Sequence, residues 1–226
     1  DFPEDYFLRH SVNEVIWHAQ VILRENSIEG VRVDLCPQSE RGGSALFLYT
    51  PVSDRLFNRT TALIDQMGLT ITDARIITSR RGYAINTYLL LDSAGEPVLD
   101  KYNGEELVTL MKQALLSEDG AISVTTRRIP RRIRQFHVST RVNFHQDEAQ
   151  HRTIVELFTT DNPGLLSHVG QIFYEQGIVI QNAKVATFGS KAEDVFFVTD
   201  KNGDTLDAES QTKLREALIE ALDQTD

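Results

Sequence analysis

The stretch that decides the fold is TIVELFTTDNPGLLSHVGQIFYEQGIVIQNAKVATFGSKAEDVFFVTD, residues 153 to 200. Residues 153 to 159 are rich in β-branched and apolar side chains, which predicts a strand. Asn162 followed by Pro163 is the pair expected at a helix N-cap and first helical position. Apolar residues at three- and four-residue spacing then predict a helix, and Gly177 supplies its left-handed end.

The stretch continues with two predicted strands, residues 178 to 188 and 194 to 200, separated by a turn at residues 189 to 193. An amphipathic pattern at residues 206 to 222 predicts a second helix. The predicted order is therefore strand, helix, strand, strand, helix.

An earlier part of the chain predicts the same order of elements. The elements are a strand at 44 to 50, a helix at 54 to 67, strands at 69 to 78 and 83 to 92, and a helix at 105 to 116. The two copies keep a constant offset, because Gly68 and Gly177 both end a first helix and 177 minus 68 is 109. Internal duplication explains this offset better than chance does.

A further strand is predicted before each copy. Residues 31 to 35 and residues 136 to 144 alternate apolar and polar side chains, the period of a strand with one buried face. A ferredoxin-like sheet needs a fourth strand beside its first, and a preceding strand fills that position as well as a trailing one would. We therefore predict an α+β fold of two ferredoxin-like domains in permuted order.

A helical connector is predicted ahead of the first domain. Ser11 with Glu14 has the spacing of a capping box, which starts a helix. The side chains expected to form its packing stripe are Val12, Val15, Ile16, Ala19, Ile22 and Leu23. Trp17 and His18 lie beside that stripe, and we interpret His18 as a packing residue rather than a ligand.

We expect four segments along the chain. They are a connector at 1–28, a first domain at 29–120, a basic linker at 121–134 and a second domain at 135–226. The run Arg127 to Arg134 is an alternative RNA- or phosphate-binding segment, but a solvated linker is the preferred interpretation.

Composition limits the classes of function. The chain has 226 residues, 41% hydrophobic, with a net charge of -10, which argues against a nucleic-acid surface over the whole molecule. There is no apolar run of membrane length and no secretory leader, so we expect a cytoplasmic protein. Cys36 is the single cysteine, which excludes a disulfide framework. Because the chain begins at Asp1, we expect a fragment.

Sequence motifs of catalysis are absent. There is no P-loop, dinucleotide-binding glycine string, His-Glu-x-x-His or nucleophile elbow. The carboxylate pairs Asp147-Glu148 and Glu193-Asp194 fall at predicted turns, where we expect them to be solvated. We therefore expect no catalytic residues and no metal ligands in this chain.

The string Asp161-Asn162-Pro163-Gly164-Leu165-Leu166, with a helix ending in glycine and a hairpin after it, resembles the signature of the ACT domain. ACT domains are small βαββαβ modules that bind amino acids and regulate enzymes. The lead-in from Asp5 to Ser11, Trp17-His18 and Arg41-Gly42-Gly43 further resemble the bacterial protein-PII uridylyltransferases, which also remove uridylyl groups.

That resemblance implies a regulatory role and a set of partners. It implies that the region senses L-glutamine or another small amino acid and controls uridylylation and deuridylylation of the PII protein. The expected partners are upstream catalytic domains and, through the full-length enzyme, PII; a homodimer is left open. No cofactor is expected in this region, whereas Mg²⁺ is implied for the absent nucleotidyltransferase and hydrolase domains.

The expected binding site lies at the start of the second copy's first helix. Amides at a helix N-terminus suit an α-carboxylate, Gly164 permits close approach, and Asp161 would meet the α-ammonium. The candidate residues are Asp161, Asn162, Pro163, Gly164, Leu165, Leu166 and Asn182, with Ser53, Asp54 and Arg55 in the first copy. Because Arg55 replaces Gly164, we expect the second copy to hold the principal site. The alternative is a dimerisation or protein-interaction module without a ligand.

Overall fold

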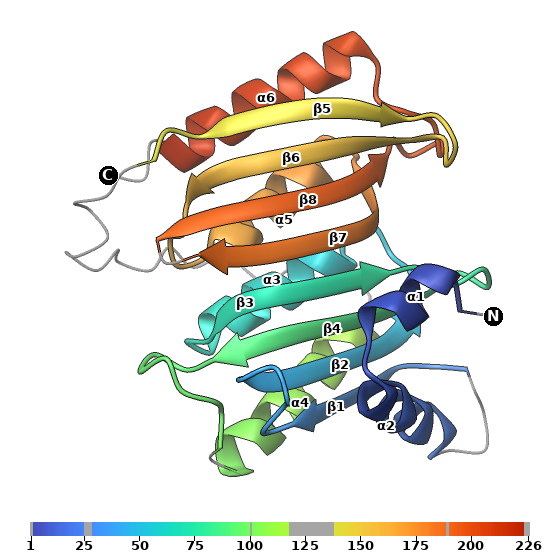
Figure 1. Ribbon diagram of the computed structural model, residues 1–226, viewed down its shortest axis with the longest axis vertical. Coiled ribbons are helices and arrows are strands. Elements are labelled where there is room, and N and C mark those ends of the chain that lie inside the picture. Colours follow the sequence, from blue (N-terminus) through green and yellow to red (C-terminus); the bar gives the residue numbers. More distant parts are fainter. Residues whose placement is uncertain (1, 25–28, 100, 118–137, 189, 224–226) are drawn as a thin grey trace. The chain divides into compact units, whose positions relative to one another are not determined.

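The computed structural model describes residues 2–24, 29–99, 101–117, 138–188 and 190–223 (Figure 1). The helices are α1 (Glu4–Arg9), α2 (Val12–Leu23), α3 (Leu56–Gln66), α4 (Lys101–Leu116), α5 (Leu165–Glu175) and α6 (Ala208–Asp223). The strands are β1 (Arg32–Cys36), β2 (Ser44–Pro51), β3 (Thr70–Ile77), β4 (Tyr83–Leu91), β5 (Arg141–Asp147), β6 (Arg152–Thr160), β7 (Val179–Phe188) and β8 (Lys191–Thr199). The basic run at 127–134 lies outside the described residues.

Contacts divide the chain into two compact units. The first comprises residues 1–53 and 67–121, and the second comprises residues 54–66 and 122–226. The second unit is therefore discontinuous, because α3 belongs with α5 and α6 although it lies within the first repeat of the sequence.

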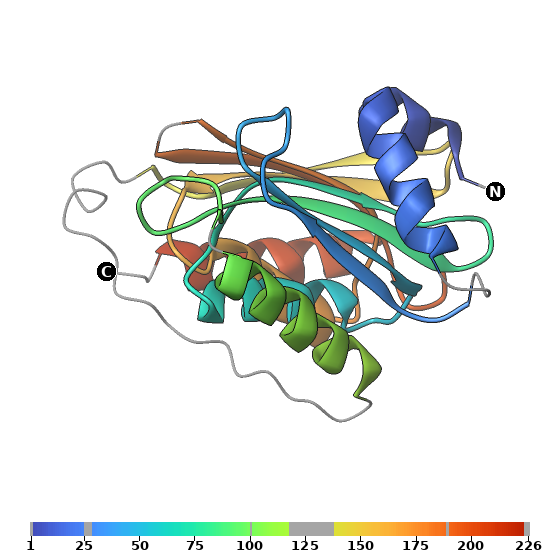
Figure 2. The same cartoon turned by 90° about the horizontal axis from the view of Figure 1, so that it is seen from below.

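The first unit holds an antiparallel sheet in the order β1-β2-β4-β3. The leading strand β1 lies beside β2, so it occupies the fourth-strand position, as predicted. Helices α1 and α2 cover one face and α4 covers the other (Figure 2). Seven of the eight residues of β2 are buried, because both faces of this sheet are covered.

The second unit repeats this sheet, in the order β5-β6-β8-β7. Its helices α3, α5 and α6 lie on one face (Figure 2). Buried side chains alternate along β6 and β8, the pattern of strands with one packed face. Phe196 on β8 meets Phe173 of α5 and Phe57 of α3, which marks the helix-facing side.

The duplication predicted from the sequence is visible in the element bounds. α3 runs from 56 to 66 and α5 from 165 to 175, so both ends are shifted by 109. β3 and β7 each contain an irregularity, between Ile71 and Asp73 and between Ile180 and Asn182, which keeps the same shift. Gly68 and Gly177 both adopt positive φ, 85° and 70°, after their helices.

Several predicted boundaries are wrong. The strand expected at 136–144 begins at Arg141 and runs to Asp147; residues 138–140 are not strand, and 136 and 137 are outside the described residues. The turn expected at 189–193 is shorter, because β8 already begins at Lys191. α4 begins at Lys101, ahead of the expected residue 105.

The packing stripe predicted for the connector helix is only partly correct, because Ile22 is buried and Val15 packs half-buried against the same core, whereas the other predicted members are exposed. The capping box of Ser11 and Glu14 is confirmed, but the buried residues of α2 are His18, Val21 and Ile22. The apolar residues that remain largely exposed on α1 and α2 are Phe7, Leu8, Val12, Ile16 and Leu23. Tyr6 on the short helix α1 occupies part of the sheet face instead, where it joins the core of Val21, Ile22 and Phe47. None of the described helices is both long and apolar enough to cross a membrane.

Candidate functional site

The start of α5 is built by a left-handed glycine. Gly164 is the N-cap residue, with φ 79° and ψ 4°, and no side chain caps the helix. The predicted N-cap at Asn162 is therefore wrong, because the chain makes one more turn before the helix begins. The carbonyl of Asn162 instead accepts the N–H of Leu165 at 3.0 Å. Glycine suits this position because an L side chain at positive φ is strained.

Some of the backbone amides expected to face a ligand are already used. The N–H of Asp161 donates to the carbonyl of Ser190, and that of Leu165 to Asn162, each at 3.0 Å. Within the described residues, the N–H groups of Leu166 and Ser167 have no backbone acceptor, as expected for a first helical turn. These two amides are therefore available to a ligand.

Ser167 adds a hydroxyl in the same turn. Its side chain is 1% exposed. Its Oγ has no hydrogen-bond partner among the described residues. A buried hydroxyl without a partner costs free energy, so this one is a natural candidate for contact with a bound group. Sequence reasoning missed Ser167 because serine early in a helix is common and carries no distinctive signal.

Asp161 and Asp194 form the carboxylate part of this region. Burial raises the pKa of Asp161 to about 6. Burial also raises the pKa of Asp194 to about 7, and the charge of Asp161 adds to that increase. The prediction that Asp194 is solvated at a turn is wrong, because it lies within β8 and is 1% exposed.

α3 brings a third carboxylate to the start of α5. A Cβ placed on Gly164 would lie 3.2 Å from Oδ2 of Asp65, a residue near the end of α3. The two helices run antiparallel, since Asn58 near the start of α3 donates to Gln171 near the end of α5 at 2.5 Å. Asp65 was missed in the sequence because its role depends on this helix pairing.

The candidate residues of the first copy are arranged differently from those of the second copy. Ser53, Asp54 and Arg55 are all exposed. Arg55 is the equivalent of Gly164, and Tyr174 is the equivalent of Asp65, at the offset of 109. Arg55 Nε donates to the hydroxyl of Tyr174 at 2.8 Å, and its guanidinium lies 4.8 Å from the ring centre. Where Gly164 faces the carboxylate of Asp65 in the second copy, the equivalent end of the first copy therefore holds an arginine and a tyrosine.

Asn182 is not brought to the predicted site. It is buried on β7 and is registered with Phe197, whereas the helix-facing residues of β8 include Phe196. Asn182 therefore belongs to the sheet face away from α5. Of the second-copy candidates, the structure gathers Asp161 through Leu166 in one loop and leaves Asn182 apart.

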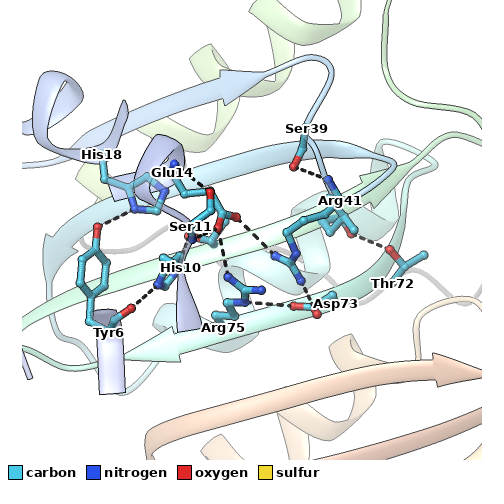
Figure 3. Close-up of polar contacts among 12 residues, drawn as sticks. Tyr6, His10, Ser11, Glu14, His18, Ser39, Arg41, Thr72, Asp73 and Arg75 are labelled. Carbon is cyan, nitrogen blue, oxygen red and sulfur yellow. Dashed lines mark hydrogen bonds and ion pairs between the residues drawn. The ribbon is translucent and has the colours of Figure 1, made fainter. Parts of the chain in front are cut away.

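The first unit contains a second group of polar side chains, beneath α1 and α2 (Figure 3). The hydroxyl of Tyr6 and Nδ1 of His18 share a hydrogen bond at 2.8 Å, and His18 stacks on Phe47 at 4.0 Å. His10 Nδ1 donates to the carbonyl of Tyr6 at 2.8 Å. Burial lowers the pKa of His18 to about 3 and lowers that of His10, so both rings are neutral at pH 7.

Beside these histidines, α2 is tied to the sheet by charge. Glu14 lies 3.3 Å from Arg75 and 3.8 Å from Arg41, and Asp73 forms ion pairs with both arginines (Figure 3). Glu14 also accepts the N–H of Ser11 in the capping box. The two carboxylates of Glu14 and Asp73 pair with the two guanidinium groups of Arg41 and Arg75, which favours an anchoring role over a ligand site. Within the described residues, no three His, Cys, Asp or Glu side chains are placed to hold a metal ion.

Comparison with known proteins identifies the class of this fold. Residues 153–218 match the ACT domain family, which covers β6 through most of α6. The ACT fold expected from the sequence is confirmed for this segment.

The sequence also resembles one group of enzymes over nearly its whole length. It is 41% identical to the bifunctional uridylyltransferase/uridylyl-removing enzyme of Methylococcus capsulatus over 218 residues, covering 96% of this chain and 25% of that enzyme. It is 37% identical to the corresponding enzyme of Pseudomonas savastanoi over 224 residues. The expected resemblance is confirmed, and the chain spans about a quarter of the length of these relatives.

Among solved structures, an aspartate kinase from Synechocystis matches with a TM-score of 0.45 and 13% identity, over 93% of this chain and 32% of the kinase. At this level of similarity the match bears on neither mechanism nor ligand.

Proposed function

We propose that the chain is an amino-acid sensing region and that its principal site is the start of α5. The observation that carries this proposal is the buried, unpartnered hydroxyl of Ser167 beside two amides that have no backbone acceptor. Water alone can satisfy the free amides of an exposed helix end. A group of unsatisfied donors that includes a buried hydroxyl is better satisfied by a bound anion.

This site combines hydrogen-bond donors with carboxylates, which match the two charged groups of an amino acid. The N-terminus of a helix carries about half a positive charge, which favours the α-carboxylate near Leu166 and Ser167. Asp65 and Asp161 supply the negative charge that an α-ammonium needs. A zwitterion therefore satisfies both the donors and the carboxylates, whereas a simple anion satisfies only the donors.

The two copies are proposed to be unequal. The second copy offers Gly164, whereas Arg55 fills the equivalent position and packs on Tyr174. Binding in the first copy would require that contact to break. The candidate residues Ser53, Asp54 and Arg55 are therefore proposed as the weaker or silent site.

The identity of the ligand and the process it controls are proposed from the relatives. Their names describe enzymes that attach and remove uridylyl groups. We propose L-glutamine as the ligand and regulation of both activities, acting on the PII protein in the cytoplasm, as the outcome. The catalytic domains that would read this signal are proposed partners of the region.

Calorimetric titration with L-glutamine, followed by a panel of the common amino acids, tests this function. We expect saturable binding of one small amino acid with an increase in melting temperature, because a ligand that binds the folded state stabilises it. A melting temperature and heat that stay unchanged at millimolar concentrations of every amino acid would contradict the sensor function.

A second candidate function is a protein-interaction module without a ligand. The observation that favours it is the number of exposed apolar side chains on α1 and α2, of which Val12 is 75% and Leu8 is 76% exposed. Exposed apolar side chains grouped on one surface are typical of interaction sites. Self-association in sedimentation experiments, without an amino-acid response, would favour this alternative over the sensor.

A further inference from the structure

Asp194 lies on the packed side of the second sheet. Ala192, Phe196 and Val198 alternate with exposed or half-buried residues along β8, and Asp194 falls in the buried series. Phe196 contacts Phe173, so this series faces the helices. A carboxylate in such a row replaces the apolar side chain that the pattern calls for, which requires a reason beyond packing.

The bonds of Asp194 are incomplete. In the pairing of β7 with β8, Lys184 lies opposite Val195 and Thr187 lies opposite Ala192. Between them, Oδ1 of Asp194 accepts the N–H of Ala186 at 3.3 Å. Its other oxygen, Oδ2, is buried and has no partner among the described residues. A buried carboxyl in this state is most stable when it carries a proton on the unpaired oxygen.

Among the described residues of the neighbouring elements, none places a cation against Oδ2 of Asp194. Asp161, just before α5, interacts with Asp194 electrostatically and is itself an acid. His168 on α5 and Asp65 on α3 lie close to Gly164. β6 places Leu157 opposite Asp194. Lys184, the basic residue on the adjacent part of β7, is exposed and alternates away from the packed face.

We infer that Asp194 is the proton-linked residue of the amino-acid site: it holds a proton when the site is empty and releases it when an ammonium group enters beside Asp161. This inference rests on the proposed function and adds to it a regulation by pH. The overall step is Asp194 carboxylic acid plus zwitterionic ligand giving Asp194 carboxylate, bound ligand and a proton in solution.

The direction of the effect follows from charge. A bound ammonium stabilises the ionised forms of Asp161 and Asp194, so it lowers their pKa values from about 6 and about 7. Binding is then opposed at low pH, where the proton must be displaced, and strengthens as pH rises. If one proton is released, affinity should increase about tenfold between pH 6 and pH 8.

The experiment is a titration of the whole chain with L-glutamine at pH 6, 7 and 8. Each titration is repeated in two buffers with different ionisation enthalpies, which gives the number of protons released per ligand. We expect one proton or slightly more near pH 6 in the parent protein, because Asp194 and Asp161 both ionise on binding. Asp194→Asn should release fewer protons, all of them from Asp161, and should lose most of the pH dependence, because asparagine still accepts from Ala186 but does not titrate.

A matched control is Glu193→Gln, which removes the same charge from the neighbouring, exposed residue of β8. It should keep both the proton release and the tenfold pH dependence. If Asp194→Asn fails to fold, Asp161→Asn serves instead, and it should lower the pKa of Asp194 as read by carboxyl carbon NMR.

The outcomes separate the two proposals. Glutamine binding with equal affinity at all three pH values and no proton release overturns the inference but leaves the sensor function standing. The inference is also overturned, and the sensor function again left standing, if Asp194→Asn retains the pH dependence of the parent. No binding of any common amino acid at any pH overturns the sensor function, and the linkage inference with it.

Discussion

The two halves of the chain have matching sheets and bury opposite kinds of titratable group. The first unit buries His10 and His18 as neutral imidazoles under α1 and α2. The second buries Asp194, with Asp161 close by, under its helices. Burial favours the uncharged form in both, which lowers the histidine pKa values and raises the carboxyl ones. One fold therefore carries two opposite responses to pH.

The largest expected effect concerns Asp194. Its folded-state pKa of about 7 lies above the ordinary value of 3.8, so the stability it contributes is present below pH 3.8 and is lost as pH rises through 7. We expect the free energy of unfolding of the second unit to fall by about 3 kcal/mol between pH 4 and pH 7 from this group. Amide hydrogen exchange in β8 measures it, and Asp194→Asn should remove that slope. An equally steep slope in the variant would contradict the assignment.

His18 should give the opposite slope in the first unit. Its folded-state pKa of about 3 lies below the ordinary 6.5, so its contribution is full above pH 6.5 and is lost as pH falls toward 3. We expect the first unit to lose about 2 kcal/mol between pH 7 and pH 5. Exchange at amides of α2 reports this change. His18→Leu should flatten the response, whereas His145→Leu, at an exposed position on β5, serves as the matched control.

The smallest expected effect compares the two helix ends. Ser167→Ala removes an unpartnered buried hydroxyl, so we expect the protein to become more stable by about 1 kcal/mol while glutamine binds at least fivefold more weakly. Thermal unfolding and calorimetry measure the two quantities. A purely structural serine would change stability without changing affinity. Ser167→Ala is also easier to interpret than a substitution of Gly164, because the φ of 79° at that position would strain any larger residue.

Arg55→Ala is the matched variant at the equivalent end. It breaks the contact with Tyr174 but touches none of the groups of the proposed principal site at the start of α5. Glutamine affinity should change by less than about twofold, the range expected of an exposed substitution. If Arg55→Ala abolishes binding and Ser167→Ala does not, the principal site lies in the first copy.

The sequence predicted the order of elements and the position of each leading strand because both follow from local patterns. Strand alternation, the glycines that end α3 and α5, and the constant offset of 109 all involve neighbours or repeats along the chain. The same reasoning located the loop from Asp161 to Leu166. The error at the start of α5 arose because turn geometry, rather than periodicity, sets that boundary.

The remaining parts of the site depend on contacts between distant segments. Asp65 meets Gly164 only because α3 and α5 pair antiparallel. Part of the connector stripe was misassigned because a histidine and a tyrosine, together with Val21 and Ile22, fill the space over Phe47. The burial of Asp194 could have been predicted from the sequence. If the strand is extended back to Lys191, Asp194 falls in the buried alternation with Ala192 and Phe196.

The discontinuity of the second unit has a consequence for how the chain folds. α3 is synthesised before residues 67 to 121, yet the helix it packs with, α5, follows them. Closing so long a loop carries an entropy cost, and such non-local contacts form late. During synthesis α3 must therefore keep its apolar side chains without their final partner until α5 emerges.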